Sequence, residues 1–511
     1  MSAAVLRRGV SRADTRRRHS GAHAPRSTAV LLLALLLAAC GDDHSATDNA
    51  VLRWNEVAQR AAGIDHRYVS QSEDPRSAGW QFGPTRTSRV FAMVHLAVAD
   101  AVAAITGAFD PYLPTDPAPP RTDADAAVAQ AAHDVLAALY PLQAADFDAD
   151  LAADLGPTPR TPATDRGVAR GRASAAAVLA ARAEDGSQWQ TPFQPVDYLY
   201  GALPGEWRAD PLHPDAKPLT PDWGAVLPFA MASGAQFRAP PPPALDSAEY
   251  AAAYDEVHAL GGDGIHSPSA RTADQTVAGI FWGYDAQPFV CAPVKLYNRI
   301  AVQLARRRGL SLADSARLMA LVNVALADAG IAVWETKYYY NFWRPITGIR
   351  EADPGTGPTG AGDGNLATSG DPTWQPLGAP ADNGSGTNFT PPFPAYPSGH
   401  AGFGGALFQI LRRFFGRDDI RFTFVSEEFD GVTVDQDGVV RPRLPRTFAS
   451  FSDAEEENGQ SRIYLGIHWP FDKVEGIRQG RTVADLVFDS VLRPRGTGGQ
   501  PNRRWAWGAA R

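Results

Sequence analysis

The chain has 511 residues, of which 44% are hydrophobic, and a formal net charge of -8 at pH 7. This length and hydrophobic content are enough for roughly two to four domains with buried cores. The acidic balance argues against a nucleic-acid-binding protein, which normally carries a basic surplus on one face. Only Cys40 and Cys291 are present, so cysteine cannot supply a zinc or iron–sulfur site. Any metal must be held by histidine or carboxylate, or arrive as an anion.

The N-terminus has the order of a bacterial export signal. Seven arginines lie among the first 26 residues, and the apolar stretch 29–39 follows them and leads into Cys40. A basic region, a short apolar region and small residues are typical of a signal peptide, and cysteine directly after Leu-Ala-Ala resembles the lipobox of bacterial lipoproteins. We expect a signal peptide over 1–40, a tether over 41–49, and an exported protein that is lipid-anchored at the cell envelope, periplasmic or extracellular. The alternatives are an ordinary secretory signal and a short buried helix.

Helical periodicity dominates the next part of the chain. Apolar residues at three- and four-residue spacing predict helices in the segments 54–61, 90–105, 123–139 and 167–183. The stretch 188–243 lacks this periodicity and is rich in proline, tryptophan and glycine, so we expect an ordered connection on the surface. Together these segments predict an N-terminal helical domain over 50–243.

A second helical block predicts a C-terminal domain over 244–495, followed by a loose tail over 496–511. Its expected helices begin near residue 247 and continue through 271–282, 292–307 and 311–340. Polar residues such as Arg317 and Asp328 interrupt the longest apolar stretch, so we expect no membrane-spanning helix there. The fold class predicted from periodicity is therefore mainly α, with two packed helix bundles.

The C-terminal block also contains two non-helical segments. Glycine, proline, aspartate and asparagine are concentrated in 351–392, which predicts a long loop. Alternating residues in 422–425 and 432–440 predict a small hairpin.

The first charged segment is KYYYNFWRP at 337–345. Lys337 and Arg344 are seven residues apart, so on a continuing helix they would project from one face, two turns apart. Pro345 lies where that helix should end or kink. Taken alone, a lysine and an arginine at this spacing most often form a solvated face.

The second segment is PSGH at 397–400, directly before an apolar run. Ser398 is a natural N-cap, and Gly399 allows the backbone to approach a ligand. The free N–H groups of a first helical turn attract anions, and His400 would lie at that turn, able to exchange a proton. A plain helix cap with an incidental histidine is the alternative.

The third segment is SRIYLGIHWPFD at 461–472. Pro470 is expected to open a helix, which places His468 at a helix break. Asp472, four residues further on, could accept a hydrogen bond from one imidazole nitrogen and fix the tautomer, so that the other nitrogen faces an anion. A core histidine satisfied by an aspartate is the alternative, and it is weakened by the presence of Arg462 and Gly466.

Together the three segments resemble the signature of the superfamily that joins vanadium-dependent haloperoxidases to type 2 phosphatidic-acid-phosphatase-like acid phosphatases. The core resemblance covers about 270–492, and the N-terminal block, including 89–104, resembles secreted bacterial members more loosely. All three parts match in order: Lys337-x6-Arg344-Pro345, Pro397-Ser398-Gly399-His400, and Ser461-Arg462-x3-Gly466-x-His468-x3-Asp472.

The resemblance implies a role for each of these residues. His468 would be the vanadium ligand, or the nucleophile of a phosphatase, with Asp472 orienting it and His400 as the acid–base group. Fixed cations in a partly dry site would stabilise a multiply charged centre. Contacts to the oxygens of vanadate, or of phosphate as a competing oxyanion, would come from Lys337, Arg344, Ser398, Gly399 and Arg462.

Two aromatic residues favour the peroxidase over the phosphatase. Phe393 and Trp334 match positions where chloroperoxidase-like members carry Phe and Trp near the halide, although both could simply pack around the motif helices. The expected reaction is oxidation of halide by hydrogen peroxide to a hypohalous-acid-type species, with Lys337 polarising the peroxide and a small organic molecule accepting the halogen. The alternatives are an acid phosphatase with a phosphohistidine intermediate and a non-catalytic oxyanion-binding protein. No nucleic-acid partner is expected, and a membrane contact only through the N-terminal lipid.

Overall fold

The computed structural model describes residues 49–67, 79–157, 159–189 and 198–495. The expected signal peptide, all of the tether except residue 49, and the tail lie outside these ranges. Residues Thr47–Arg511 belong to one compact unit, in which helices of both predicted domains pack together; the boundary at residue 243 stays a prediction.

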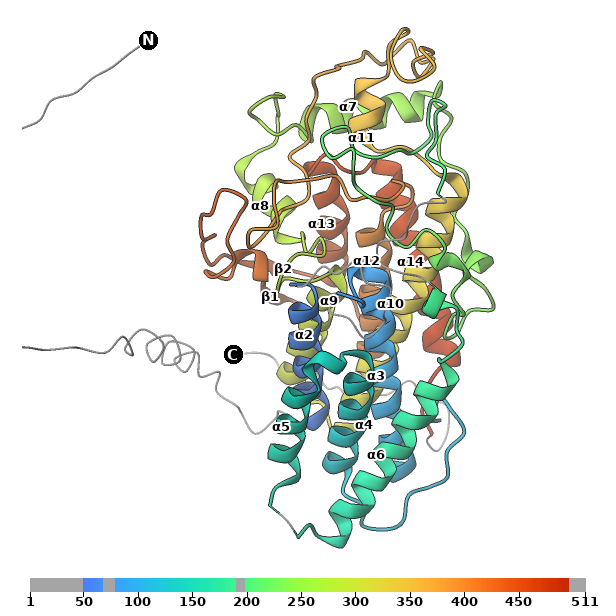
Figure 1. Ribbon diagram of the computed structural model, residues 1–511, viewed down its shortest axis with the longest axis vertical. Helices are drawn as coiled ribbons and strands as arrows, with labels where there is room; N and C mark the ends of the chain where they lie inside the picture. The colour runs from blue at the N-terminus through green and yellow to red at the C-terminus, as the bar shows by residue number, and fades with distance from the viewer. Residues whose placement is uncertain (1–48, 68–78, 158, 190–197, 496–511) are drawn as a thin grey trace, which may run out of the picture. The chain divides into compact units, whose positions relative to one another are not determined.

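The chain is mainly helical, as predicted (Figure 1). The first half contains α2 (Ala50–Asp65), α3 (Gly83–Thr106), α4 (Ala124–Leu139), α5 (Ala144–Leu155) and α6 (Pro162–Ala181). The second half contains α7 (Ala248–Leu260), α8 (Ala273–Phe281), α9 (Pro293–Arg308), α10 (Leu312–Tyr340), α11 (Pro345–Arg350), α12 (Gly399–Phe415), α13 (Phe451–Tyr464) and α14 (Pro470–Ser490). Short 3-10 turns lie at Pro141–Gln143, Ser187–Trp189, Trp223–Ala225, Gly234–Phe237 and Glu427–Phe429.

Helix α10 is the centre of the packing and contacts α3, α12 and α14. Its one buried carboxylate in mid-helix, Asp328, is satisfied by the surface connection. The Asp328 side chain accepts hydrogen bonds from the backbone N–H groups of Phe229, Ala230 and Met231 at 2.6, 2.8 and 3.0 Å. Buried charge is tolerated when it is hydrogen-bonded in this way, so Asp328 fixes the connection to the core.

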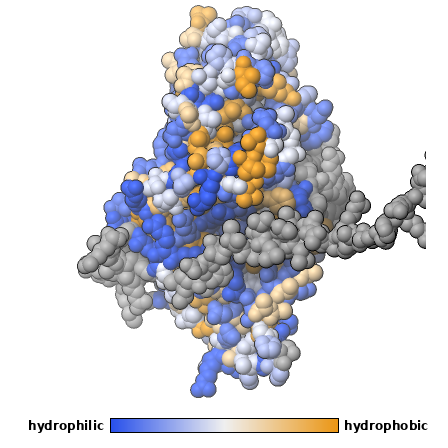
Figure 2. All heavy atoms as spheres, turned by 90° about the vertical axis from the view of Figure 1, so that its left-hand side faces the viewer, coloured by the Kyte–Doolittle hydropathy of each residue, from blue (hydrophilic) through white to orange (hydrophobic). Residues whose placement is uncertain are grey.

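Two helices are long and apolar enough to cross a membrane by length and composition, namely α3 and α10. In α10 the polar residues Arg317 and Asp328, which were expected to interrupt the apolar stretch, do not prevent it from meeting this criterion. Both helices are almost completely buried inside the protein. A long apolar helix that is buried in this way is typical of the core of a helical bundle. On the face shown in Figure 2, hydrophobic side chains form separate patches among hydrophilic ones.

Helices α12 and α14 approach each other closely because glycines line their contact. A Cβ atom on Gly480 would lie 2.0 Å from the carbonyl oxygen of Gly402, and one on Gly405 would lie 2.6 Å from that of Ile477. The start of α12 is tied to the first turn of α14, since the Ser398 N–H donates to the Asp472 carbonyl at 2.9 Å. The second and third charged segments therefore meet at one end of this helix pair.

The described part of the connection 198–243 is ordered, as predicted. Trp207 and Trp223 are buried, and the Trp207 N–H donates to the Asn341 carbonyl at 2.7 Å. The Leu219 N–H donates to the Pro392 carbonyl at 3.0 Å. This segment and the loop 351–392 therefore lie side by side.

The predicted hairpin was only partly right. Strand β1 (Phe422–Val425) exists, but its antiparallel partner is β2 (Pro445–Phe448). The segment 432–440 makes only an isolated bridge between Val434 and Val440. Its other valines are exposed, Val432 by 74%, so their alternation covers no core and cannot stabilise a strand.

Candidate active site

The first segment reaches the site by a route different from the predicted one. Helix α10 ends at Tyr340 because Asn341 adopts the left-handed conformation, with φ 51° and ψ 40°, and Arg344 is the N-cap of the next helix. The prediction that Lys337 and Arg344 share one face of a continuing helix was therefore wrong. Asparagine is one of the few residues that tolerate this helix-ending conformation.

Lys337 and Arg344 nevertheless converge on one stretch of backbone. Lys337 Nζ donates to the carbonyls of Pro394 and Ala395 at 2.7 and 2.8 Å, and Arg344 Nε donates to that of Phe393 at 2.8 Å. Both side chains are buried. An ammonium has three donors, so Lys337 keeps one N–H beyond these two bonds.

The second segment forms the predicted cap. The Ser398 side chain accepts from the Ala401 N–H, and Gly399 begins α12. His400 Nε2 lies 2.6 Å from the Gly283 carbonyl oxygen, which only accepts, so Nε2 carries the proton and Nδ1 is unprotonated. Burial, and then the charge of Arg462, hold the pKa of His400 well below its usual value.

The third segment contains the predicted aspartate–histidine pair. His468 Nδ1 lies 2.8 Å from Asp472 Oδ2, and His468 Nε2 lies 3.0 Å from Arg344 Nη1. Because the guanidinium only donates, Nε2 is the unprotonated nitrogen and Nδ1 donates to Asp472. Burial, and then the charge of Arg344, lower the pKa of His468 well below its usual value. The neutral imidazole therefore presents a lone pair among the cations.

A tight turn brings Arg462 and His468 to the same site. Gly466 has φ 70°, which favours glycine. A Cβ atom there would lie 2.4 Å from the Gly261 carbonyl oxygen. This turn separates α13, whose last turn carries Arg462, from α14, which begins at Pro470 as predicted.

Asp285 is a site residue that the sequence analysis missed. Both of its carboxylate oxygens accept from Arg462 Nη2, each at 2.7 Å, and the two side chains are 6% and 1% exposed. Asp285 lies in a loop between α8 and α9 without a recognisable spacing to any motif. Asp285 follows only a glycine and a tyrosine in the sequence, and this local pattern does not predict that it pairs with Arg462.

The loop that carries Asp285 is held in an unusual conformation. Tyr284, Ala286, Phe289 and Cys291 all have positive φ, between 51° and 71°, a conformation that costs energy for residues other than glycine. The loop is fixed by Glu428, whose Oε1 accepts from the Tyr284 N–H at 2.6 Å. The same loop supplies the Gly283 carbonyl that binds His400, so it orients two sides of the site.

The assembled site has the donors that an oxyanion requires. Within the described ranges, Arg344 Nη2 and Arg462 Nε are buried N–H groups without a hydrogen-bond partner. Two arginines and Lys337 face the carboxylates Asp285 and Asp472, so the cations are in excess when all are ionised. Unsatisfied buried donors cost free energy, and a tetrahedral oxyanion with several acceptor oxygens would satisfy them. The residues present therefore fit vanadate or phosphate.

The pKa shifts show the cost of this arrangement without an anion. Burial, and then the charge of Arg344, hold the pKa of Lys337 well below its usual value. Burial lowers the pKa of Arg344 to about 9 and raises that of Asp472 to about 7. The charged forms are thus penalised in the buried site.

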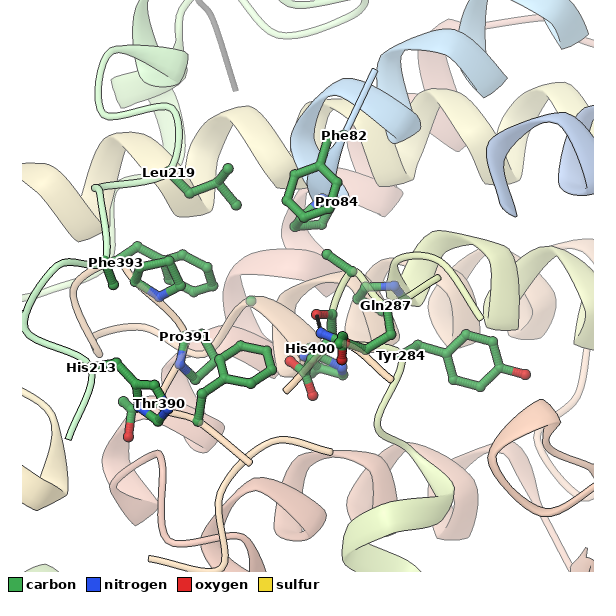
Figure 3. A pocket seen from close by; sticks show the side chains of 18 of the residues that line it. Phe82, Pro84, His213, Leu219, Tyr284, Gln287, Thr390, Pro391, Phe393 and His400 are labelled. Carbon is green, nitrogen blue, oxygen red and sulfur yellow. Dashed lines mark hydrogen bonds between the residues drawn. The ribbon is translucent and has the colours of Figure 1, made fainter. Parts of the chain in front are cut away.

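A cavity of about 530 Å³ leads to these groups. Six of the ten predicted site residues line it, and Lys337, Arg344, Ser398 and Asp472 lie buried behind them. The rings of Trp334 and Phe393 are 4.9 Å apart between centroids and form part of its wall, as Figure 3 shows for Phe393. The six lining residues are Trp334, Phe393, Gly399, His400, Arg462 and His468.

The fold and the site together define a helical protein with a buried oxyanion-binding centre. Comparison with known proteins shows to which family this protein belongs. Residues 37–156 match the vanadium chloroperoxidase (VCPO) N-terminal domain, and residues 317–496 match the VCPO second helical-bundle domain. The vanadium chloroperoxidase of Curvularia inaequalis is 32% identical over 502 residues, which cover 83% of this chain and 79% of that protein. The chain belongs to the vanadium chloroperoxidase family of haloperoxidases.

Solved structures show the same fold. A bacterial vanadium-dependent iodoperoxidase superposes with a TM-score of 0.68 at 23% identity, over 88% of this chain and 98% of its own. The holo form of a bacterial vanadium-dependent chloroperoxidase superposes with a TM-score of 0.59 at 17% identity, over 82% of this chain and 95% of its own. The predicted mainly α fold of the haloperoxidase type is confirmed.

Proposed function

We propose that this protein is a vanadate-dependent haloperoxidase, which uses hydrogen peroxide to oxidise halide to a hypohalous-acid-type halogenating species. One observation carries the proposal: Arg344 Nη2 and Arg462 Nε, which are buried and have no hydrogen-bond partner among the described residues, lie in the same site as the unprotonated Nε2 of His468. A vanadate ion needs such donors for its oxygens and an imidazole for its metal. Membership of the family supports the same cofactor.

The residues of the site have distinct tasks in this proposal. Lys337, Arg344 and Arg462 would hold the oxygens of vanadate, with Ser398 and the Gly399 N–H adding hydrogen bonds. When bound, vanadate would supply the Lewis acidity that activates peroxide. Because the protein has fixed these cations before the oxyanion arrives, little reorganisation is needed.

The histidines divide the proton chemistry. Asp472 accepts a hydrogen bond from His468 Nδ1 and keeps Nε2 unprotonated; the Nε2 lone pair, which accepts from Arg344 Nη1 at 3.0 Å, would bind the metal in place of that N–H. His400 donates from Nε2 to the Gly283 carbonyl, so its Nδ1 is the nitrogen that can take a proton from peroxide and return it. Trp334 and Phe393 give the halide an apolar wall that excludes water.

The test is halogenation of a phenol-type indicator by protein lacking the residues before Gly41, with peroxide, chloride or bromide, and with or without orthovanadate. We expect turnover that requires vanadate, falls when phosphate competes for the site, and is lost in His468→Ala. His266→Ala is the matched control, since His266 also pairs with an aspartate, Asp263, at 2.7 Å but does not line the cavity. Absence of halogenation together with vanadate-inhibited hydrolysis of a phosphomonoester would instead establish the phosphatase alternative.

We also propose that the protein is exported and anchored to the cell envelope by lipid on Cys40. The support is the order of basic, apolar and small residues before that cysteine, which lies outside the described ranges. Mass spectrometry of the mature N-terminus should find a diacylated cysteine, and Cys40→Ser should release the protein from the membrane fraction. An unmodified mature N-terminus elsewhere would contradict the anchor.

A further inference from the structure

The active-site cavity contains a second aspartate–histidine pair, which lies outside the three charged segments. His213 Nδ1 is 2.9 Å from Asp210 Oδ2, and His213 Nε2 is 3.1 Å from Thr387 Oγ1. His213 and Thr387 both line the cavity. In Figure 3, His213 lies beside Thr390 and Pro391, on the side of the cavity where Phe393 lies.

The contacts of Asp210 determine which nitrogen of His213 is basic. Asp210 also accepts from the backbone N–H groups of Leu212 at 2.8 Å and Thr390 at 3.1 Å, and its side chain is 2% exposed. These N–H groups leave Asp210 Oδ2 as the acceptor for the His213 Nδ1–H, so Nε2 is unprotonated and its lone pair accepts from the Thr387 hydroxyl at 3.1 Å. The His213 side chain is 31% exposed and stands on the cavity wall.

A second polar group beside His213 lacks a partner. Thr390 lines the cavity and is only 4% exposed, and within the described part of the chain its Oγ1 is buried without a hydrogen bond. A buried hydroxyl left unpaired costs free energy, which a ligand hydroxyl would recover. The neighbouring wall is apolar, formed by Pro391, Pro392 and Phe393. A few polar groups, here His213 and Thr390, beside a mainly apolar wall are typical of a site that orients a small organic ligand.

We propose that this part of the cavity binds the organic halogen acceptor, that the acceptor is a hydroxyarene of the phenol class, and that His213 is its base. The phenolic hydroxyl would replace the exposed Thr387 hydroxyl as the donor to His213 Nε2 and accept from Thr390 Oγ1, while the ring packs against the prolines and Phe393. The cavity of about 530 Å³ has room for such a ring. The inference rests on the proposed function, which supplies the hypohalous acid.

The step balances without another reagent. His213 takes the phenolic proton as a ring carbon forms its bond to halogen, and the halogen–oxygen bond of hypohalous acid breaks. The departing hydroxide takes the proton from His213 and becomes water. The halogenated carbon then loses its own proton while the oxygen regains one, which restores the aromatic ring and leaves a halophenol.

Binding is measured first, by calorimetry with phenol and with its methyl ether, anisole, in the absence of peroxide and halide. Wild-type protein should bind phenol at least tenfold more tightly than anisole. His213→Gln should bind phenol about tenfold more weakly and anisole unchanged, and Thr390→Val should show a smaller loss. His266→Gln is the matched control, because it lies in the same Asp-x-x-His turn with a side chain 60% exposed.

Turnover is then measured with vanadate, peroxide and bromide. The ortho-to-para ratio of bromophenol made by wild-type protein should differ from that made by reagent hypobromous acid, and His213→Gln should shift it toward the reagent value. Equal phenol binding by wild type and His213→Gln, or a wild-type product ratio equal to the reagent ratio, would overturn the inference. Phenol binding that depends on His213 without any vanadate-dependent halide oxidation would refute the proposed function and leave the binding site supported.

Discussion

Replacing Arg441 with methionine should destabilise the protein through the loop that carries Asp285. Arg441 Nη1 donates to Asp382 Oδ1 at 2.6 Å and to Glu428 Oε2 at 2.8 Å, and the side chains of both carboxylates are fully buried. Glu428 in turn holds the Tyr284 N–H at 2.6 Å. This ionic cluster therefore connects the hairpin region to the loop that orients Arg462 and His400.

The expected magnitude follows from the charges. Removing one partner of a buried ion pair costs about 3–5 kcal/mol, against a total stability of about 5–15 kcal/mol for a typical protein. Burial, and then the charge of Asp382, raise the pKa of Glu428 well above its usual value, so the buried site disfavours the charged form of this carboxyl group. Arg441→Met also leaves the fully buried Asp382 carboxylate without its guanidinium partner.

A matched series separates charge from packing. Adding Asp382→Asn to Arg441→Met should recover about half of the lost stability, because it removes the isolated charge. Glu428→Gln should cost less than about 1 kcal/mol, since glutamine keeps the acceptor for the Tyr284 N–H. Glu428→Leu removes that acceptor and should cost about 1–3 kcal/mol more than Glu428→Gln.

The assay is urea unfolding followed by tryptophan fluorescence, with orthovanadate affinity measured on the same variants. Glu428→Leu should weaken vanadate binding at least tenfold, and Glu428→Gln should leave it within about twofold. The reasoning fails if Arg441→Met lies within 1 kcal/mol of wild type, or if Asp382→Asn gives no recovery in its background.

Three further predictions concern other parts of the molecule. Asp472→Asn should weaken vanadate binding about 10–100-fold by calorimetry, because His468 is then no longer held in the tautomer with the proton on Nδ1. The unfolding temperature should not fall, because the substitution also removes a buried charge; unchanged vanadate affinity would contradict the prediction. Gly480→Ala should destabilise the protein by about 3 kcal/mol in urea unfolding, since its Cβ would lie 2.0 Å from the Gly402 oxygen; equal midpoints would exclude tight α12–α14 packing. Burial lowers the pKa of His95 from 6.5 to about 3, so its unfolded form binds a proton below pH 6.5 that the folded form refuses. Stability is thus lost as pH falls from 6.5, and between pH 7 and pH 5 wild type should lose about 2 kcal/mol relative to His95→Leu; a pH-independent difference would show that His95 is not buried neutral.

The parts of the site that could be predicted from sequence are those governed by local chemistry. Ser398 caps α12 and Pro470 opens α14 because capping hydroxyls and N-terminal prolines act within one helical turn. The bond between His468 and Asp472 has the same origin, since residues four apart meet across the first turn. These features needed no knowledge of distant contacts.

The predictions that failed, or that could not be made, depend on contacts between distant residues or on the backbone conformation of a single residue. Asp285 pairs with Arg462, 177 residues away, and nothing in its neighbourhood marks it. Helix α10 ends at Tyr340, within the predicted range, but the left-handed Asn341 turns the chain before Arg344, so the argument from one shared helix face failed. The valines of 432–440 alternate as a strand would, but no core lies beneath them.

The pKa shifts explain why the same residues that weaken the fold should make it bind an oxyanion. Burial disfavours the charged forms of Lys337 and Arg344, lowering their pKa values, and raises the pKa of Asp472. An oxyanion placed among the cations would favour their charged forms and would accept from Arg344 Nη2 and Arg462 Nε, which have no partner within the described ranges. Since only the folded state offers this arrangement, vanadate should stabilise the fold by about 2.7 kcal/mol at a hundredfold excess over Kd. Folding therefore already bears the unfavourable free energy of burying these charged groups. The affinity for vanadate is high because no further reorganisation is required when the oxyanion binds.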